Sequence, residues 1–373
     1  MARLSTCSWV LALLFLGLAA APPDRALQAQ EGGAEAKQTT GRDPGAALLT
    51  AAFQLSQKSP RTIAEFTAII DGAENGIEQA TTERWQKYGQ QLAAWAYSKR
   101  GQLMADADEP DNKKILADFE RAVAHHAKSS DTAEWSYYHH RGVSYAIDGQ
   151  FDKALADFNQ VLKLRPNFGK EYFNRAEVYS ALSQFGKARD DYNSALDNGH
   201  RESTVYSRRG FAHFKLDNLR SALADYNRAI QLNSRDFEAL TYRGDVQAAN
   251  GDFGAAIRDY QQAIAIDNTF GRTYFSAAWF RATCPDAEYR SASLALRSAR
   301  RAIELDGENH RYLDALAAAH ARAGEFDDAV AAIKKAIAMA PKSGVDALKA
   351  RLALYEEKKA YVSVQRSGEG GKQ

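Results

Sequence analysis

Cysteine and proline are scarce in this chain. Its 373 residues include only two cysteines, Cys7 and Cys284, and eight prolines. Few prolines permit long helices, because proline removes a backbone donor and clashes with the preceding turn inside a helix. Alanine, leucine, arginine and glutamate are abundant, and all four are good helix formers. The composition therefore favours a folded chain that is helical throughout.

Long hydrophobic runs are also missing, except for a short one near the N-terminus. Residues 1–21 comprise a polar start, an apolar run over residues 9–18 and three alanines at the end. This order is typical of a secretory signal peptide, and the run is shorter than the ~20 residues of a membrane-spanning helix. We assign residues 1–29 to a signal peptide, with cleavage after Ala21 or after Ala29. A permanent membrane anchor is the alternative.

Removal of residues 1–29 would change both the cysteine count and the charge. Cys284 becomes the only cysteine, so the mature chain has no internal disulfide even though disulfides persist outside the cytoplasm. Arg3, Arg25 and Asp24 are lost as well, which leaves 46 basic and 46 acidic residues. A balanced chain lacks the excess of lysine and arginine that binds phosphate backbones. We expect an exported protein, periplasmic or extracellular, that neither binds nucleic acid nor inserts into membranes.

What the chain does contain is a repeat of 34 residues. An arginine followed by glycine or alanine recurs at this spacing from Arg141 to Arg243, and Arg100 precedes the series. An aspartate follows each arginine at a nearly constant distance. Such a period indicates stacked helical hairpins without a single globular core. We call these positions the arginine–aspartate ladder: Arg100, Arg141, Arg175, Arg209 and Arg243, with Asp118, Asp157, Asp191, Asp225 and Asp259.

Large and small side chains alternate in the same register. A large apolar residue opens the second helix of each hairpin, an alanine follows one turn later, and an aromatic residue comes next: Phe158, Tyr192, Tyr226 and Tyr260. Alanine or glycine on one helix makes room for an aromatic ring from the other where antiparallel helices approach closely. The pattern predicts an all-α fold, an α-solenoid of about seven antiparallel helix pairs followed by a capping helix.

One hairpin carries most residues of a known repeat signature: Tyr138, Gly142, Tyr145, Ala154, Phe158 and Pro166. Over about residues 94–341 the chain resembles the tetratricopeptide repeat family, and the turn at 282–287 with the helix at 313–319 resembles those of secreted, stand-alone bacterial repeat proteins. The resemblance implies a binding function, with the first helix of each hairpin lining a concave groove.

The chain divides into six segments. Helices are expected over residues 46–57, 60–72, 82–105 and 111–127, and a final polar-faced helix over 345–362. The segments are the signal peptide (1–29), a disordered linker (30–45), degenerate N-terminal helices (46–93), the repeat array (94–341, with units near residues 94, 135, 169, 203, 237, 271 and 310), a capping helix (342–362) and a disordered tail (363–373).

The ladder is open to two interpretations, a charged binding stripe or an internal brace. Equal numbers of both charges favour the brace, in which each arginine meets an aspartate of its own or an adjacent hairpin. The last two units carry Ala277 and Leu316 at the arginine position, so the ladder ends before them. Function is therefore expected on the remaining face of the first helices.

The family resemblance assigns a peptide-binding groove to that face. Aromatic side chains would supply binding area there, and arginine and asparagine would fix the register of a bound peptide. A groove that is only solvated is the alternative. The predicted groove residues are Lys170, Phe173, Asn174, Glu177, Ser207, Arg208, Phe211, Tyr242, Asp245, Phe275 and Trp279.

One branch of the family clamps a C-terminal carboxylate with two lysines, two asparagines and an arginine. Only Asn174 and Arg208 fall at matching positions here, while His139, Val143 and Thr204 occupy the other three. We therefore do not expect this clamp.

No motif predicts catalysis, a cofactor or a metal site. The pairs His125–His126 and His139–His140 are adjacent residues, which point about 100° apart on a helix and cannot chelate one ion by themselves. Cys284 is expected to be a buried anchor of its turn, with a reactive or dimer-forming thiol as the alternative. The sequence predicts a non-catalytic scaffold that binds a protein or peptide. A self-associating structural element is the second hypothesis, and a ligand-binding or enzymatic role in the groove is the third.

Overall fold

The computed structural model describes residues 43–129 and 134–363, and its regular elements there are all helical. The described residues form seventeen α-helices and no strand, and consecutive helices pack as pairs, which confirms the predicted all-α solenoid. The predicted signal peptide (1–29) lies outside the described residues. None of the described helices is long and apolar enough to cross a membrane. The chain forms two compact units, Met1–Gly199 and His200–Gln373, called unit 1 and unit 2 below.

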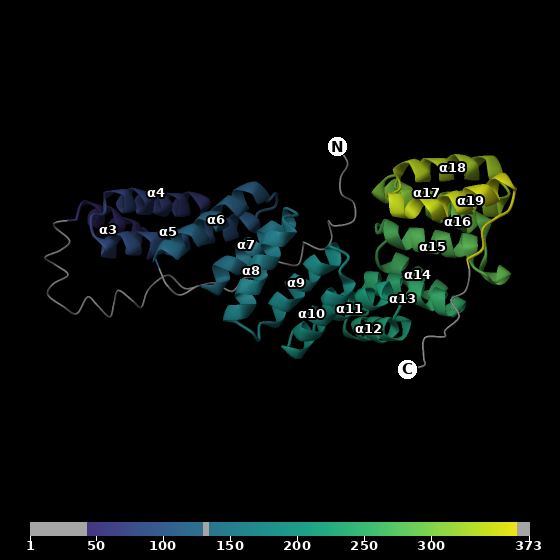
Figure 1. The fold of residues 1–373 in the computed structure, drawn as a ribbon, viewed down its shortest axis with the longest axis horizontal. Coiled ribbons are helices and arrows are strands. Elements are labelled where there is room, and N and C mark those ends of the chain that lie inside the picture. Colours follow the sequence, from purple (N-terminus) through teal and green to yellow (C-terminus); the bar gives the residue numbers. More distant parts are fainter. Residues whose placement is uncertain (1–42, 130–133, 364–373) are drawn as a thin grey trace. The chain divides into compact units, whose positions relative to one another are not determined.

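Each unit is a series of helical hairpins (Figure 1). Unit 1 contains α3 (Pro44–Ser56), α4 (Ile63–Gln79), α5 (Glu83–Ala105), α6 (Asn112–Ser129), α7 (Trp135–Ile147), α8 (Phe151–Leu164), α9 (Gly169–Ala181) and α10 (Phe185–Asp197). Unit 2 contains α11 (Ser203–Lys215), α12 (Leu219–Leu232), α13 (Phe237–Asn250), α14 (Phe253–Ile266), α15 (Gly271–Thr283), α16 (Ala292–Asp306), α17 (His310–Ala323), α18 (Phe326–Met339) and α19 (Val345–Glu356).

The first hairpin differs from its expected boundaries. Helix α3 begins at Pro44, inside the segment assigned to the linker, because the Asp43 side chain caps its N-terminus. Helix α4 begins at Ile63 instead of residue 60, because Thr62 and Glu65 form a reciprocal capping box. It also continues past Gly72 to Gln79. Glycines inside α4 mark close packing against α3 and do not end the helix.

The arginine–aspartate ladder joins the two helices of five hairpins, α5–α6, α7–α8, α9–α10, α11–α12 and α13–α14. In all five pairs, Nε and Nη2 of the arginine donate to the two carboxylate oxygens of the aspartate at 2.6–2.9 Å. The aspartates are only 4–6% exposed. Two parallel charge-assisted bonds are a strong and orientation-specific form of this contact. The ladder therefore has the geometry of an internal brace, and each arginine meets the aspartate of its own hairpin.

The third guanidinium nitrogen connects some hairpins to the one before. Nη1 of Arg175 donates to Asn159 Oδ1 at 2.6 Å, and Nη1 of Arg243 donates to Asn227 Oδ1 at 2.8 Å. The residue after the ladder arginine must be very small, since a Cβ on Gly244 would lie 2.6 Å from Tyr260 Cε1. The spacing of arginine, tiny residue and aspartate is thus a direct consequence of how closely the two helices approach.

Buried histidines fill part of the core of unit 1. The His140 ring stacks on Phe119 with centroids 5.3 Å apart, and its Nε2 lies 3.0 Å from Gln102 Nε2. Burial lowers the pKa of His140 to about 3, and the nearby charges of His139, Lys99 and Lys170 act in the same direction. His140 is therefore a neutral core residue at physiological pH.

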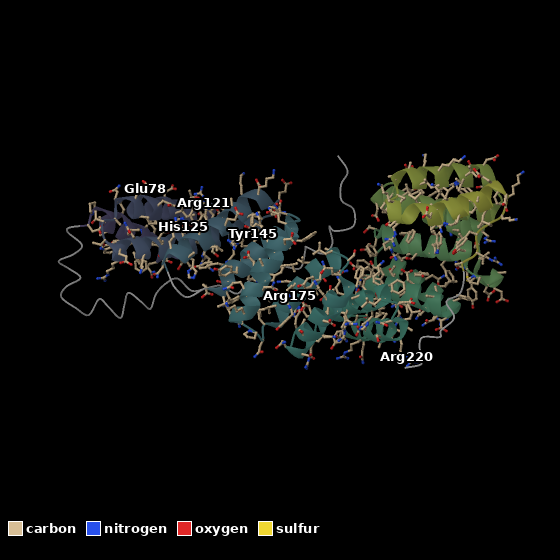
Figure 2. The ribbon with its side chains drawn as sticks, in the orientation of Figure 1. Glu78, Arg121, His125, Tyr145, Arg175 and Arg220 are labelled. Atoms are coloured by element: carbon tan, nitrogen blue, oxygen red, sulfur yellow. The ribbon has the colours of Figure 1, made fainter. Side chains whose placement is uncertain are left out.

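Removal of one ladder arginine should destabilise the fold strongly. Arg175→Ala (Figure 2) leaves the Asp191 carboxylate, which is 6% exposed, without its partner, so we expect the free energy of unfolding to fall by about 3 kcal/mol. Arg189→Ala is the control, because Arg189 pairs with the exposed Asp190 and such pairs contribute less than about 1 kcal/mol. Urea denaturation measures both variants. Equal losses would contradict the bracing role.

Neutral His140 should make the protein less stable in acid. Its folded pKa lies below the ordinary value of 6.5, so the unfolded chain takes up this proton first and stability falls as the pH drops from 6.5 towards 3. The loss is at most about 1.4 kcal/mol per pH unit. Urea denaturation at several pH values should show a flatter pH dependence of stability for His140→Gln than for the unsubstituted protein. An unchanged slope in His140→Gln would count against this role.

Candidate protein-binding groove

The predicted groove residues of unit 1 lie mainly in the interior of α9. Phe173, Asn174 and Glu177 are 7%, 1% and 4% exposed, and Lys170 is half-buried. Glu177 accepts a short hydrogen bond from the Tyr192 hydroxyl, and the Phe173 and Tyr192 rings pack 5.9 Å apart. The exposed groove surface expected at these three positions is therefore not present, because their side chains pack onto neighbouring helices.

The groove of unit 2 is formed by its first helices, α11, α13, α15 and α17. These helices lie against one another in order, and their facing side chains interact across the boundaries. Ser207 is buried, but the other predicted residues form a connected set. It consists of Arg208, Phe211, Tyr242, Asp245, Phe275 and Trp279.

Ion pairs and rings connect this set. Arg208 Nη1 donates to Glu238 Oε2 at 3.1 Å, and Phe211 packs on Tyr242 with centroids 5.2 Å apart. Asp245 accepts from Arg272 Nη2 at 2.7 Å and from the Tyr260 hydroxyl at 3.0 Å. Both groove carboxylates, Glu238 and Asp245, are thus held by arginine.

A cavity of about 470 Å³ opens among these helices in unit 2. Aromatic and aliphatic side chains form most of its wall, and Arg272, Ser276 and Arg311 contribute polar atoms. Arg311 was not among the predicted groove residues. Arg311 is the second residue of α17, as Arg272 is the second residue of α15. The repeat register could therefore have identified Arg311 as a groove residue.

The C-terminal segment closes one end of this cavity. Helix α19 ends at Glu356, not at residue 362 as expected, and Lys358 adopts a φ of 58° that turns the chain back. Residues 359–363, which we call the C-terminal strap, then run without helical structure towards α15. Tyr361 and Ser363 both line the cavity.

Main-chain hydrogen bonds hold the strap in place. The Ser363 amide and hydroxyl donate to the Thr283 carbonyl at 2.8 and 2.9 Å, and Arg322 Nη2 donates to the Tyr361 carbonyl at 2.9 Å. The Tyr361 ring packs on Trp279, 5.9 Å between centroids, and the Arg351 guanidinium lies 5.5 Å from the Tyr361 ring. The strap therefore shows how this surface contacts a non-helical chain segment.

A second cavity, of about 750 Å³, lies where the ladder is interrupted. In the hairpin α15–α16 the ladder positions hold Ala277 and Ser298, and both residues line this cavity together with Arg281. The short side chains cannot span the distance that an arginine and an aspartate bridge elsewhere. The interrupted ladder and the cavity therefore occur in the same hairpin, and α14 completes the cavity wall.

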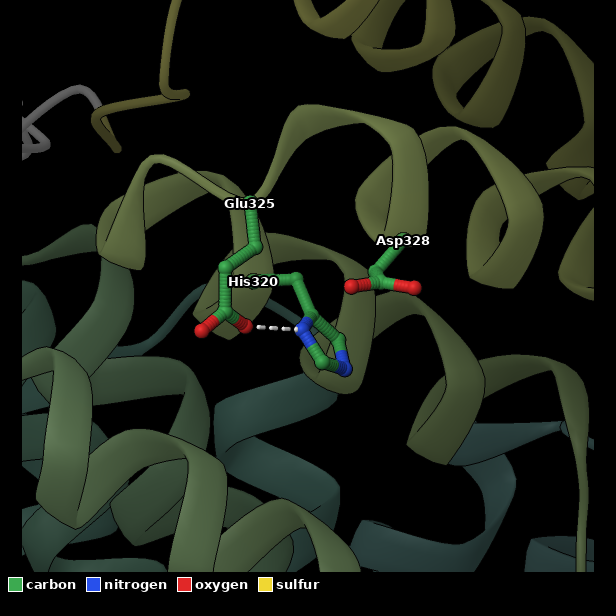
Figure 3. A group of neighbouring side chains, drawn as sticks. All are labelled: His320, Glu325 and Asp328. Atoms are coloured by element: carbon green, nitrogen blue, oxygen red, sulfur yellow. Dashed lines mark hydrogen bonds and ion pairs between the residues drawn. The ribbon is translucent and has the colours of Figure 1, made fainter.

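One group of potential metal ligands occurs in the described residues (Figure 3). His320 Nδ1 lies 2.6 Å from Glu325 Oε2, and one ligand atom each of His320, Glu325 and Asp328 lie within 4.8 Å of one another. Glu325 is the N-cap residue of α18 and Asp328 is in its first turn. Carboxylates are stabilised at a helix N-terminus, so the position of both acids is explained without an ion.

Solved structures that are similar to this chain include tetratricopeptide repeat proteins. One from Parabacteroides merdae is 16% identical with a TM-score of 0.55, and the match covers 70% of this chain and 98% of that one. YrrB, described as having an unusual peptide-binding site, is 22% identical over 52% of this chain and 95% of its own, with a TM-score of 0.41. The first repeat domain of Spaghetti, bound to an HSP90 peptide, is 31% identical over 29% of this chain and 86% of its own, with a TM-score of 0.29.

Family models support the same assignment at the level of sequence. No curated protein matches the chain significantly. Two models described as tetratricopeptide repeat match, one over residues 135–168 and the other over residues 208–269 and 290–344. The hairpins α7–α8, α13–α14 and α17–α18 lie within these ranges, and α11–α12 lies mostly within the second. The chain therefore carries tetratricopeptide repeats over these three ranges, in an all-helical fold that it shares with the solved Parabacteroides merdae protein.

Proposed function

We propose that this chain is a non-catalytic scaffold that holds an extended segment of a partner protein in the groove of unit 2. The tetratricopeptide repeat fold supports a role in protein interaction. The observation that carries the proposal is the C-terminal strap. It occupies one end of the groove with backbone hydrogen bonds to Thr283 and Arg322 and with one aromatic ring against Trp279.

The same contacts are suited to a bound peptide, because they recognise the main chain and one large side chain of an extended segment. The groove continues beyond the strap along Phe275, Tyr242 and Phe211, whose rings offer further apolar area. Its carboxylates, Asp245 and Glu238, are engaged by arginine, which disfavours a role as general acid or base.

The proposal includes export. The pattern of residues 1–29 and the likeness of residues 282–287 and 313–319 to secreted bacterial proteins support a periplasmic or extracellular location. A structural element that self-associates is the alternative function, and Cys284 would be its most direct means of covalent dimerisation. Against that route, Cys284 is 1% exposed, and burial raises the pKa of its thiol.

Photo-crosslinking tests the groove. A benzoylphenylalanine residue in place of Phe275 should give discrete adducts with a partner protein in intact cells, because Phe275 lines the groove cavity. The same residue in place of Leu232, which is 43% exposed on α12, is the control and should give none. Adducts from position 232 alone would place binding outside the groove.

Sedimentation and thiol labelling test self-association. Residues 30–373 should sediment as a monomer at micromolar concentration with or without a reductant. Cys284 should react with a disulfide reagent only after unfolding, since the buried and protonated thiol is a poor nucleophile. A dimer that dissociates on reduction would favour the structural alternative.

A further inference from the structure

The groove of unit 2 contains more positive than negative charge. Lys215 of α11, Arg272 of α15 and Arg311 of α17 act on one another electrostatically, and the carboxylate among them is Asp245. Asp245 is already bound to Arg272 at 2.7 Å. Arg208 adds no net charge because it pairs with Glu238. Among the described residues, Lys215 and Arg311 have no carboxylate within salt-bridge distance.

Two buried donors in the same cavity lack acceptors. Arg272 Nε and Ser276 Oγ have no hydrogen-bond partner among the described residues, and Ser276 is 3% exposed. They are four residues apart on α15, so they lie on one helix face, and both residues line the cavity. Buried donors without acceptors are costly, and an anionic group in the cavity would lie beside both of them.

Aromatic rings hold the cationic groups in position. The Arg272 guanidinium lies 5.3 Å from the Tyr242 ring centroid and 5.1 Å from that of Phe275, and Arg311 lies 5.5 Å from Phe275. The Lys215 ammonium lies 5.2 Å from the Phe211 centroid. Guanidinium groups fixed by stacking lose less freedom when they bind a carboxylate, and their planar donors match its two oxygens.

The positive charges of Lys215, Arg272 and Arg311 also repel one another. Desolvation lowers the pKa of Lys215, and the charges of Arg311 and Arg272 lower it further. Desolvation and the charge of Arg272 likewise lower the pKa of Arg311. The strap contributes no compensating carboxylate, because its cavity-lining residues, Tyr361 and Ser363, are uncharged. An anionic group from a ligand would relieve this repulsion.

We infer that the groove of unit 2 selects an acidic partner segment, an extended stretch of protein whose aspartate or glutamate side chains bind Arg311 and Lys215. This inference rests on the proposed function, since it defines the chemistry of the segment that the groove would hold. The strap places the aromatic contact at Trp279, and the cationic groups lie beside it across Phe275. The preferred segment therefore combines an aromatic residue with acidic neighbours.

Fluorescence anisotropy with two labelled peptides tests this selectivity on the mature chain. One peptide consists of glutamate and tyrosine, and in the other glutamine replaces every glutamate. We expect the acidic peptide to bind about tenfold more tightly, and the difference to shrink as salt is added because exposed charges are screened. Lys215→Ala combined with Arg311→Ala should abolish the difference.

A charge-matched double variant serves as the control. Arg220→Ala combined with Arg235→Ala removes two exposed cations from the same unit and should leave the selectivity intact; Arg220 is shown in Figure 2. Urea denaturation confirms that each variant is folded. Equal binding of both peptides, unaffected by the Lys215 and Arg311 changes, would overturn the acidic preference and leave groove binding standing. Absence of binding by either peptide, together with no crosslink from position 275, would overturn both.

Discussion

The bidentate ion pair between an arginine of the first helix and an aspartate of the second is the contact on which the rest of the structure depends. It fixes the rotation and the axial position of the two helices relative to each other, because both carboxylate oxygens must meet Nε and Nη2 at once. The residue after the arginine must then be glycine or alanine, and an aromatic ring fills the space beside it. Stability and register come from the same side chains.

The ladder also determines what remains available for binding. Its arginines and aspartates are engaged within the hairpins, so a ligand meets the other face of the first helices. In unit 1 that face is largely buried at α9, whereas in unit 2 it forms a cavity with a cationic wall. Where Ala277 and Ser298 interrupt the ladder, a second cavity appears. The asymmetry between the units thus follows from local departures from a common repeat.

Much of the fold could be predicted from the sequence, and the groove only in part. The first helices α7, α9, α11, α13, α15 and α17 begin at the residues where the repeat units were expected, because the 34-residue spacing and the ladder fix the register. Phe173 and Glu177 could not be recognised as buried, since a helix position alone does not show whether the next helix covers it. Arg311 stands at the same repeat position as Arg272, but its place in the cavity wall follows only from the packing of α17 against α15.

The sequence by itself determined the class of fold, the pairing of helices and the internal position of the ladder, because these depend on contacts between residues close together in the chain. The tertiary structure decided the contacts of the C-terminal strap and the positions of the cationic side chains. The C-terminal strap reaches α15 through hydrogen bonds between residues 80 positions apart, and the cationic cluster draws on three different helices. No local pattern encodes such contacts. They exist only after the stacked hairpins have brought distant side chains onto one surface.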